Sequence, residues 1–356
     1  MQTDLLQEAR RQAEICNACR YCEGYCSVFP ALHQERFFTD GNLTQLANLC
    51  HNCRGCYYAC QYTAPHEFDL NLPKALAEVR QDSWERFAWP GPLAQIFQKN
   101  GVMIAVATVL GFAVLFLAMR TLGSAGGDGF YAVLSHNAMV AIFLPAFLFP
   151  LFSIAIGLRR YWQGTDGKRI TLAHIVGAFG SAANMKNLAG GHGDGCNFED
   201  EDKFSNARRL AHQAVMYGFL LCFAATSAGT ILHYVFNMPA PYPLWSLPKL
   251  LGVPGGILMV LGTVELARLK LKADRNLGAS SAWGGEMGFV LLLFLVALSG
   301  LLLYWLGGTQ IMPLMLAIHL GSVLSFVLLT PYTKMAHGFY RLAALIRDEQ
   351  RKAAPE

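Results

Sequence analysis

Eight of the ten cysteines fall in two runs that share one spacing. The runs are Cys16, Cys19, Cys22 and Cys26, and then Cys50, Cys53, Cys56 and Cys60. Cys-x2-Cys-x2-Cys-x3-Cys is the spacing of bacterial two-cluster ferredoxins, in which the fourth thiolate of each run binds the cluster of the other run. The spacing therefore predicts two [4Fe–4S] clusters. The first would use Cys16, Cys19, Cys22 and Cys60, and the second Cys50, Cys53, Cys56 and Cys26.

Structural zinc and disulfides are the alternatives for so many cysteines. Zinc sites use separated Cys-x2-Cys pairs with four thiolates per ion, which tandem four-cysteine runs fit poorly. Disulfides would require an exported domain, yet residues 1–98 show no signal-peptide pattern. The 23 residues between Cys26 and Cys50 are too long for a tight hairpin and favour helix. We expect residues 1–98 to form an α-helical, ferredoxin-like domain.

The remaining two thirds of the chain are apolar enough for a membrane. Hydrophobic residues make up 54% of the chain and charged ones 15%, which excludes an ordinary soluble enzyme. The net charge of +4 is too small to predict nucleic-acid binding. Six apolar stretches approach the ~20 residues that a helix needs to cross a bilayer. They are residues 101–119, 133–157, 212–234, 252–267, 286–306 and 311–330.

These stretches predict an all-α fold in which residues 99–356 form a six-helix transmembrane bundle. A polar insert at 158–211 separates the second stretch from the third. Lysine and arginine gather in the insert, after the fourth stretch and after the sixth, whereas the opposite connections hold Arg120 and Lys249. The positive-inside rule therefore predicts a multi-pass protein of the cytoplasmic (inner) membrane, with both termini and the cysteine domain in the cytoplasm.

Five histidines are candidate ligands of b-type haem, because histidine within a membrane helix usually has a function. His212 and His233 lie about 31 Å apart along the third helix, and His319 and His337 about 27 Å apart if the sixth helix continues past Pro331. The two helices are antiparallel, which predicts one pair, His212 and His337, at the cytoplasmic level. The other pair, His233 and His319, would share the outer level, for one or two haems in all.

His136, near the outer end of the second helix, competes with either member of the outer pair. The alternative is that all five histidines are packing or interface residues. Two more histidines, His174 and His192, lie in the polar insert, where solvation is the simpler interpretation. His192 and Cys196 could also share a metal ion, although no further ligand is apparent.

The chain resembles the tricarballylate (citrate) utilisation protein B family, and the C-terminal portion of a related fused cobalt-vitamin biosynthesis oxidoreductase. The resemblance depends on both cysteine runs, on Gly191-His192-Gly193-Asp194-Gly195-Cys196 and on Phe204-Ser205-Asn206-Ala207-Arg208-Arg209. It implies a protein that reoxidises a partner FAD-dependent dehydrogenase of the fumarate-reductase type. Electrons would pass through the clusters and haem to the membrane quinone.

The residues agree with that role. We find no Gly-x-Gly-x-x-Gly fingerprint after a strand, so the flavin must belong to a partner protein. A tricarboxylate transporter is a rival function, but its apolar stretches should carry ionisable residues, and these carry almost none beyond Glu265. A membrane-bound iron–sulfur redox sensor is the other rival. It would need an output domain, and none is visible.

Overall fold

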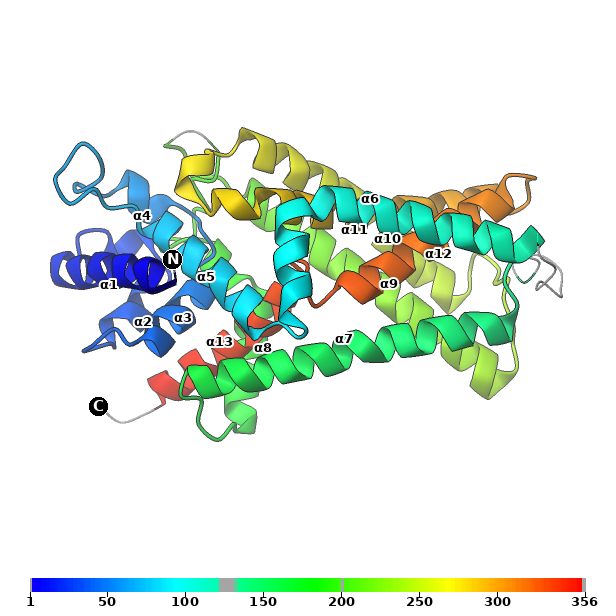
Figure 1. The fold of residues 1–356 in the computed structure, drawn as a ribbon, viewed down its shortest axis with the longest axis horizontal. Helices are drawn as coiled ribbons and strands as arrows, with labels where there is room; N and C mark the ends of the chain where they lie inside the picture. The colour runs from blue at the N-terminus through cyan, green and yellow to red at the C-terminus, as the bar shows by residue number, and fades with distance from the viewer. Residues whose placement is uncertain (1, 122–130, 132, 200–201, 354–356) are drawn as a thin grey trace.

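The chain is a succession of helices joined by short turns, as a computed structural model describes it for residues 2–121, 131, 133–199 and 202–353 (Figure 1). Within those residues the β structure is a single antiparallel bridge between Cys196 and Ser205. The predicted all-α class is confirmed. Residues 200 and 201 of the predicted insert lie outside the described residues.

Five helices form the N-terminal domain. They are α1 (Gln2–Cys19), α2 (Phe29–His33), α3 (Asp40–Leu49), α4 (Gly55–Tyr58) and α5 (Leu72–Phe87), with a 3-10 turn at Glu23–Tyr25. Local signals set their starts: the Thr39 hydroxyl accepts a hydrogen bond from Asn42 N at the beginning of α3, and Asn71 does the same for α5. Their apolar faces bury residues such as Phe29 and Leu43 in a common core.

Among the described residues, six helices are long and apolar enough to cross a membrane, which agrees with the predicted number. They are α6 (Gly91–Thr121), α7 (His136–Gly164), α9 (Ala207–Phe236), α10 (Leu247–Lys272), α11 (Trp283–Leu306) and α12 (Met312–Leu329). The chain is thus a multi-pass membrane protein. A kink at Asn100 divides α6, so that its first turns run across the end of the bundle and the rest runs along it (Figure 1).

Small residues allow the membrane helices to approach closely. A Cβ atom on Gly218 of α9 would lie 2.7 Å from the carbonyl oxygen of Gly255 in α10. Likewise, a Cβ atom on Gly101 of α6 would lie 2.6 Å from the Cα atom of Gly285 in α11. Since lipid gives apolar helices no hydrophobic reason to associate, such close backbone packing is what holds them together.

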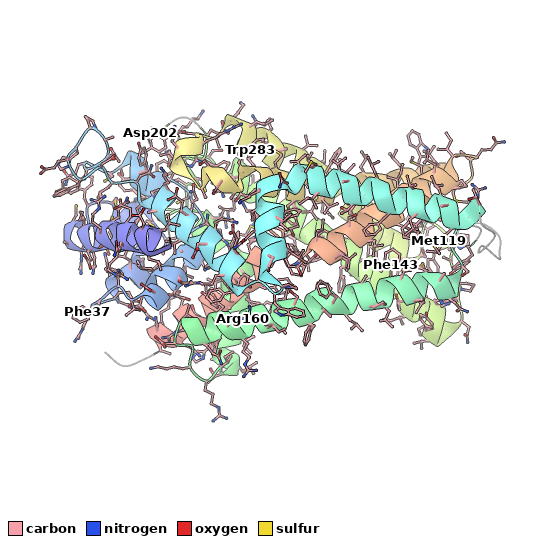
Figure 2. The ribbon with its side chains drawn as sticks, in the orientation of Figure 1. Phe37, Met119, Phe143, Arg160, Asp202 and Trp283 are labelled. Atoms are coloured by element: carbon pink, nitrogen blue, oxygen red, sulfur yellow. The ribbon has the colours of Figure 1, made fainter. Side chains whose placement is uncertain are left out.

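The long axis of the molecule runs from the N-terminal domain to the far end of the bundle. Figure 2 shows Phe37 at the domain end, Arg160 and Trp283 near the junction, and Met119 and Phe143 toward the opposite end. We call the bundle end next to the domain proximal and the other end distal. The rings of Phe116 and Phe143 stack at 6.3 Å in an apolar cluster of the distal half.

The expectation that the sixth membrane helix continues past Pro331 is wrong. α12 ends at Leu329, and after a turn the chain resumes as α13 (Ala336–Lys352). Proline has no backbone N–H and its ring clashes with the preceding turn, so the helix stops there. α13 then packs against α3, α7 and α8 (Leu172–Ala183), the helix formed by the polar insert. His337 therefore lies on α13 and not on a membrane-spanning helix.

The N-terminal domain is attached to the bundle through buried hydrogen bonds. The Tyr161 hydroxyl of α7 donates to Gln45 Oε1 of α3 at 2.8 Å, and Gln45 Nε2 donates to the Ala344 carbonyl of α13 at 2.7 Å. Arg351 of α13 forms an ion pair with Glu35 of the domain. The hydrogen bonds of Gln45 thus connect α3, α7 and α13, which are distant in sequence.

We predict that Tyr161→Phe lowers the thermal unfolding midpoint of the purified protein, because it leaves a buried amide oxygen without a donor at a cost of ~1–3 kcal/mol. The matched control is Tyr217→Phe, which removes a hydroxyl that donates to Ala183 O at an exposed site. Circular dichroism on heating measures both. Equal midpoints for the two variants would contradict the role of Tyr161 at the junction.

Candidate metal centres

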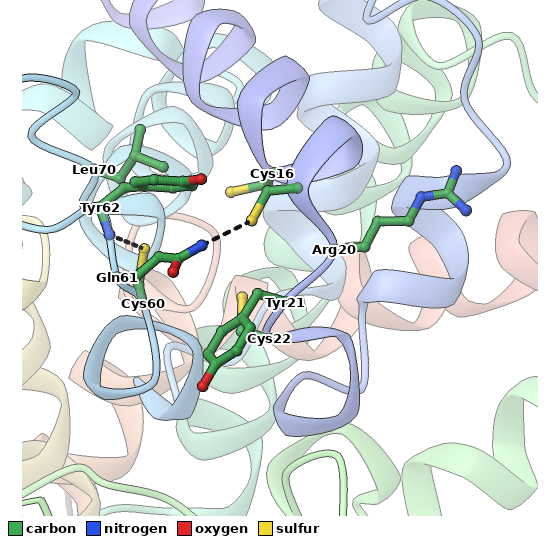
Figure 3. Close-up of a pocket in the computed structure, with 9 residues that line it drawn as sticks. Cys16, Arg20, Tyr21, Cys22, Cys60, Gln61, Tyr62 and Leu70 are labelled. Atoms are coloured by element: carbon green, nitrogen blue, oxygen red, sulfur yellow. Dashed lines mark hydrogen bonds between the residues drawn. The ribbon is translucent and has the colours of Figure 1, made fainter.

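Four cysteines of the predicted first site line one pocket. Cys16 and Cys19 come from the last turn of α1, Cys22 from the turn that follows, and Cys60 from beyond α4. Figure 3 shows Cys16, Cys22 and Cys60 around this space, with Tyr62 and Leu70 beside them. The space between these residues is about 260 Å³, including the part open to solvent. Cys60, from the second cysteine run, thus lies beside three cysteines of the first run.

The predicted second site has the reciprocal arrangement. Cys26, Cys50 and Cys56 line a second pocket of about 320 Å³, whose other walls are apolar side chains such as Phe29 and Leu76. Cys53 does not line this pocket and packs instead with Cys196 in a separate buried cluster. Cys26, the last cysteine of the first run, therefore lies beside cysteines of the second run.

The buried thiols must lose their protons before they can bind a metal. Burial, followed by the neighbouring Cys22 thiol, raises the pKa of Cys16, and burial raises the pKa of Cys22 to about 12. Metal binding replaces those protons. N–H groups already point at the sulfur atoms: Tyr62 N donates to Cys60 Sγ at 3.4 Å, and Gln61 Nε2 donates to Cys19 Sγ at 3.9 Å.

The cysteines surround spaces and do not converge on a point. Among the described residues, no three histidine, cysteine or carboxylate side chains are grouped closely enough to hold one metal ion. Four thiols spread around a pocket suit a group larger than a single ion. The donor set, which is all sulfur, is the one that iron–sulfur clusters use. The residues present therefore fit the implied group.

The loop of the second run is bonded to the proximal end of the bundle. Arg80 and Arg341 both donate to the Cys50 carbonyl, at 2.6 and 3.0 Å, and Arg208 of α9 donates to the Asn52 carbonyl at 2.8 Å. Asn52 Nδ2 in turn donates to the Leu277 carbonyl, at 2.7 Å, in the connection between α10 and α11. By contrast, the first pocket is lined by residues of the N-terminal domain.

Two candidate haem ligands meet at the proximal end. The rings of His212 in α9 and His337 in α13 lie 5.8 Å apart and nearly perpendicular. His337 Nδ1 donates to the Lys334 carbonyl, which leaves its Nε2 for another partner. His212 Nδ1 is buried without a hydrogen-bond partner, as are Nε and Nη1 of Arg341.

The distal end brings together a different pair from the one that helix spacing suggests. His233 stacks on His136 with ring centroids 4.6 Å apart, and His136 Nε2 lies 2.9 Å from the Tyr234 hydroxyl. His319 instead shares a hydrogen bond of 3.0 Å with Ser299 of α11. It lies about 10 Å inside α12, deeper than the helix ends that carry the other two.

The comparisons with known proteins agree with this organisation. The family described as "Citrate utilization protein B" matches residues 91–356, and its "Fer4-like domain" matches residues 9–85. A protein of Escherichia coli, "Citrate utilization protein B", is 42% identical over 346 residues, which cover 96% of this chain and 91% of that protein. This chain belongs to the citrate utilization protein B family. No solved structure matches it.

The family membership, with its Fer4-like domain, supports an iron–sulfur electron-transfer protein in a membrane. The structure adds residues that sequence reasoning missed. Glu286 at the start of α11 accepts from Lys334 at 2.6 Å and also from Lys270. Burial lowers the pKa of Lys334 to about 7, although Glu286 opposes the shift. Charged residues at the ends of three predicted spans were the available signal.

The two remaining histidines go to different neighbours. His174 completes the capping box of α8 with Thr171, so it has a structural partner. His192 packs edge-on against Tyr25 at 5.2 Å, whereas the Cys196 thiol faces Cys53 and Leu188. A metal ion shared by His192 and Cys196 therefore has no support in the contacts of either side chain.

Proposed function

We propose that this protein reoxidises a partner FAD-dependent dehydrogenase of the fumarate-reductase type and carries the electrons through two [4Fe–4S] clusters and b-type haem to the membrane quinone. The observation that carries the proposal is the exchange of fourth cysteines: Cys60 lies with the first run and Cys26 with the second. Clusters and haem each accept one electron at a time, which suits a donor flavin that releases two.

The contacts of the two sites suggest the direction of flow. The first site is bounded by the N-terminal domain alone, with the exposed Tyr21 ring at its rim. We place the docking surface of the flavoprotein there. The second site is bonded to α9, α13 and the α10–α11 connection, so electrons that reach it are next to the membrane helices.

The histidine pairs fit haem at both ends of the bundle. His212 and His337 would hold the proximal haem, and the two free nitrogens of Arg341 would bind its carboxylates. His136 and His233 would hold the distal one, with the Tyr234 hydroxyl orienting His136. His319 has a partner in Ser299, and we assign it to packing.

The membrane arrangement follows the distribution of basic residues. From the lysine and arginine at the proximal end, we propose that this end, both termini and the cysteine domain face the cytoplasm, with the bundle in the inner membrane. The relative from Escherichia coli is named for citrate utilization. We therefore propose that the dehydrogenase acts on a tricarboxylate such as tricarballylate.

Protein purified without oxygen should contain about eight cluster iron atoms and about eight acid-labile sulfides. Cys26→Ser should lose the same electron paramagnetic resonance signal as Cys50→Ser, since both residues line the second pocket. Cys60→Ser should instead match Cys16→Ser. If Cys26→Ser matched Cys16→Ser, the exchange would be refuted. One metal ion per four cysteines without sulfide would mean zinc.

His233→Leu should remove one low-spin b-type haem signal, about half of the haem if two are present, because the variant deletes a ligand and keeps the apolar helix. His319→Leu is the matched control and should retain the full haem content. Pyridine haemochrome assays and reduced-minus-oxidised spectra measure both. The opposite result, loss of haem in His319→Leu alone, would restore His319 as the ligand.

In nanodiscs, dithionite should reduce the cluster and haem bands of the wild-type protein, and a quinone analogue should reoxidise them. Cys50→Ser, which lacks the site next to the membrane helices, should slow reoxidation of the first cluster by at least tenfold, about 1.4 kcal/mol in barrier. Rapid-mixing absorbance measures the rate. A redox sensor or a transporter would show no reoxidation by quinone.

A further inference from the structure

Residues 185–199 and 202–206, which we call the cover, lie across both cysteine loops. Gly191 N donates to the Tyr25 carbonyl at 3.2 Å, and Asn187 Nδ2 donates to the Leu49 carbonyl at 3.4 Å. Asn197 N donates to the Cys53 carbonyl at 2.8 Å. The described part of the cover is therefore bonded to the backbone on either side of the second pocket.

Two glycines make this approach possible. A Cβ atom on Gly191 would lie 1.8 Å from the Gly24 carbonyl oxygen, so any side chain there would push the cover away from the first loop. Gly195 has φ +105° and would place a Cβ atom 2.2 Å from the Ser205 carbonyl oxygen. The glycine-rich sequence thus fits a backbone that must pack against backbone.

The cover brings a ninth cysteine to the second site. Cys196 is 1% exposed, and backbone hydrogen bonds of 2.9 and 3.0 Å to Ser205 hold it in place. Its thiol packs in one buried cluster with Cys53, a predicted ligand, and donates its hydrogen to the Leu188 carbonyl at 3.3 Å. The guanidinium of Arg208, 3.9 Å above the Phe198 ring, hydrogen-bonds to the same sulfur.

We propose that Cys196 is a positioning residue whose thiol hydrogen turns from the Leu188 carbonyl to the Cys53 sulfur when Cys53 binds the second cluster. The proposal rests on the iron–sulfur assignment made above. A cysteine bound to iron has no proton and can only accept, so Cys196 is the donor at this contact. Hydrogen bonds to cluster sulfurs stabilise the more negative, reduced state and raise the reduction potential.

Cys196→Ala should keep both clusters but lower the potential of the second. At the midpoint potential of the wild-type second cluster, the ratio of reduced to oxidised second cluster in the variant should be ~10-fold lower. This is the size expected for losing one hydrogen bond to a charged acceptor. Cys196→Ser keeps a donor and should restore part of the shift. Redox titration followed by electron paramagnetic resonance measures both, and the signal that Cys50→Ser lacks identifies the second cluster.

Two matched controls isolate the effect. Cys222→Ala removes the other cysteine outside the two runs, a half-buried thiol of α9, and should leave both potentials unchanged. Gln61→Leu removes the amide that donates to Cys19 Sγ and should lower the potential of the first cluster alone.

Three results bear on the proposal differently. An unchanged second potential in Cys196→Ala overturns it, because the hydrogen bond then has no effect on the cluster. Loss of the second cluster in Cys196→Ala also overturns it, because Cys196 would be a ligand. Wild-type protein without any cluster signal would instead refute the iron–sulfur assignment, so the two failures are distinguishable.

Discussion

The arrangement of the molecule depends on how the loop of the second cysteine run is held. Its backbone adopts left-handed conformations at Asn52 and Arg54, with φ of +53° and +69°. Buried carbonyls without donors would each cost ~1–3 kcal/mol. Arg80, Arg208 and Arg341 supply those donors from three separate helices. The bonds from Arg208 of α9 and Arg341 of α13 also attach the cysteine domain to the proximal end of the bundle, whereas Arg80 belongs to the domain itself.

These donors are cations, which has an electrostatic consequence. Burial, followed by the neighbouring Arg80, lowers the pKa of Arg341 well below its usual value, so the site is costly while no anion is present. Glu286 is shared between Lys270 and Lys334, which leaves positive charge in excess. An anionic cluster bound to four thiolates would offset that charge. Ligand binding and attachment of the domain are in this way expected to reinforce each other.

Helix periodicity has different predictive power at the two ends of the bundle. His212 and His337 meet even though the argument that paired them assumed a continuous sixth helix, and Pro331 interrupts it. They meet because α13 folds back over the proximal end. At the distal end the spacing argument favoured His319, but depth along a helix does not specify which neighbour it faces. His136 was a candidate there, and it is the residue that stacks on His233.

The sequence by itself determined the class of the protein. The repeated cysteine spacing and the six apolar stretches are local patterns, and each predicts its structure because the chemistry needs ligands or apolar residues at short, regular intervals. Contacts across long separations were decided by the tertiary structure. Cys53 meets Cys196 because glycines allow the cover to pack on the cysteine loops, and Tyr161 meets Gln45 because α3, α7 and α13 converge. Such contacts follow from how faces of distant helices pack, and no spacing along the chain encodes them.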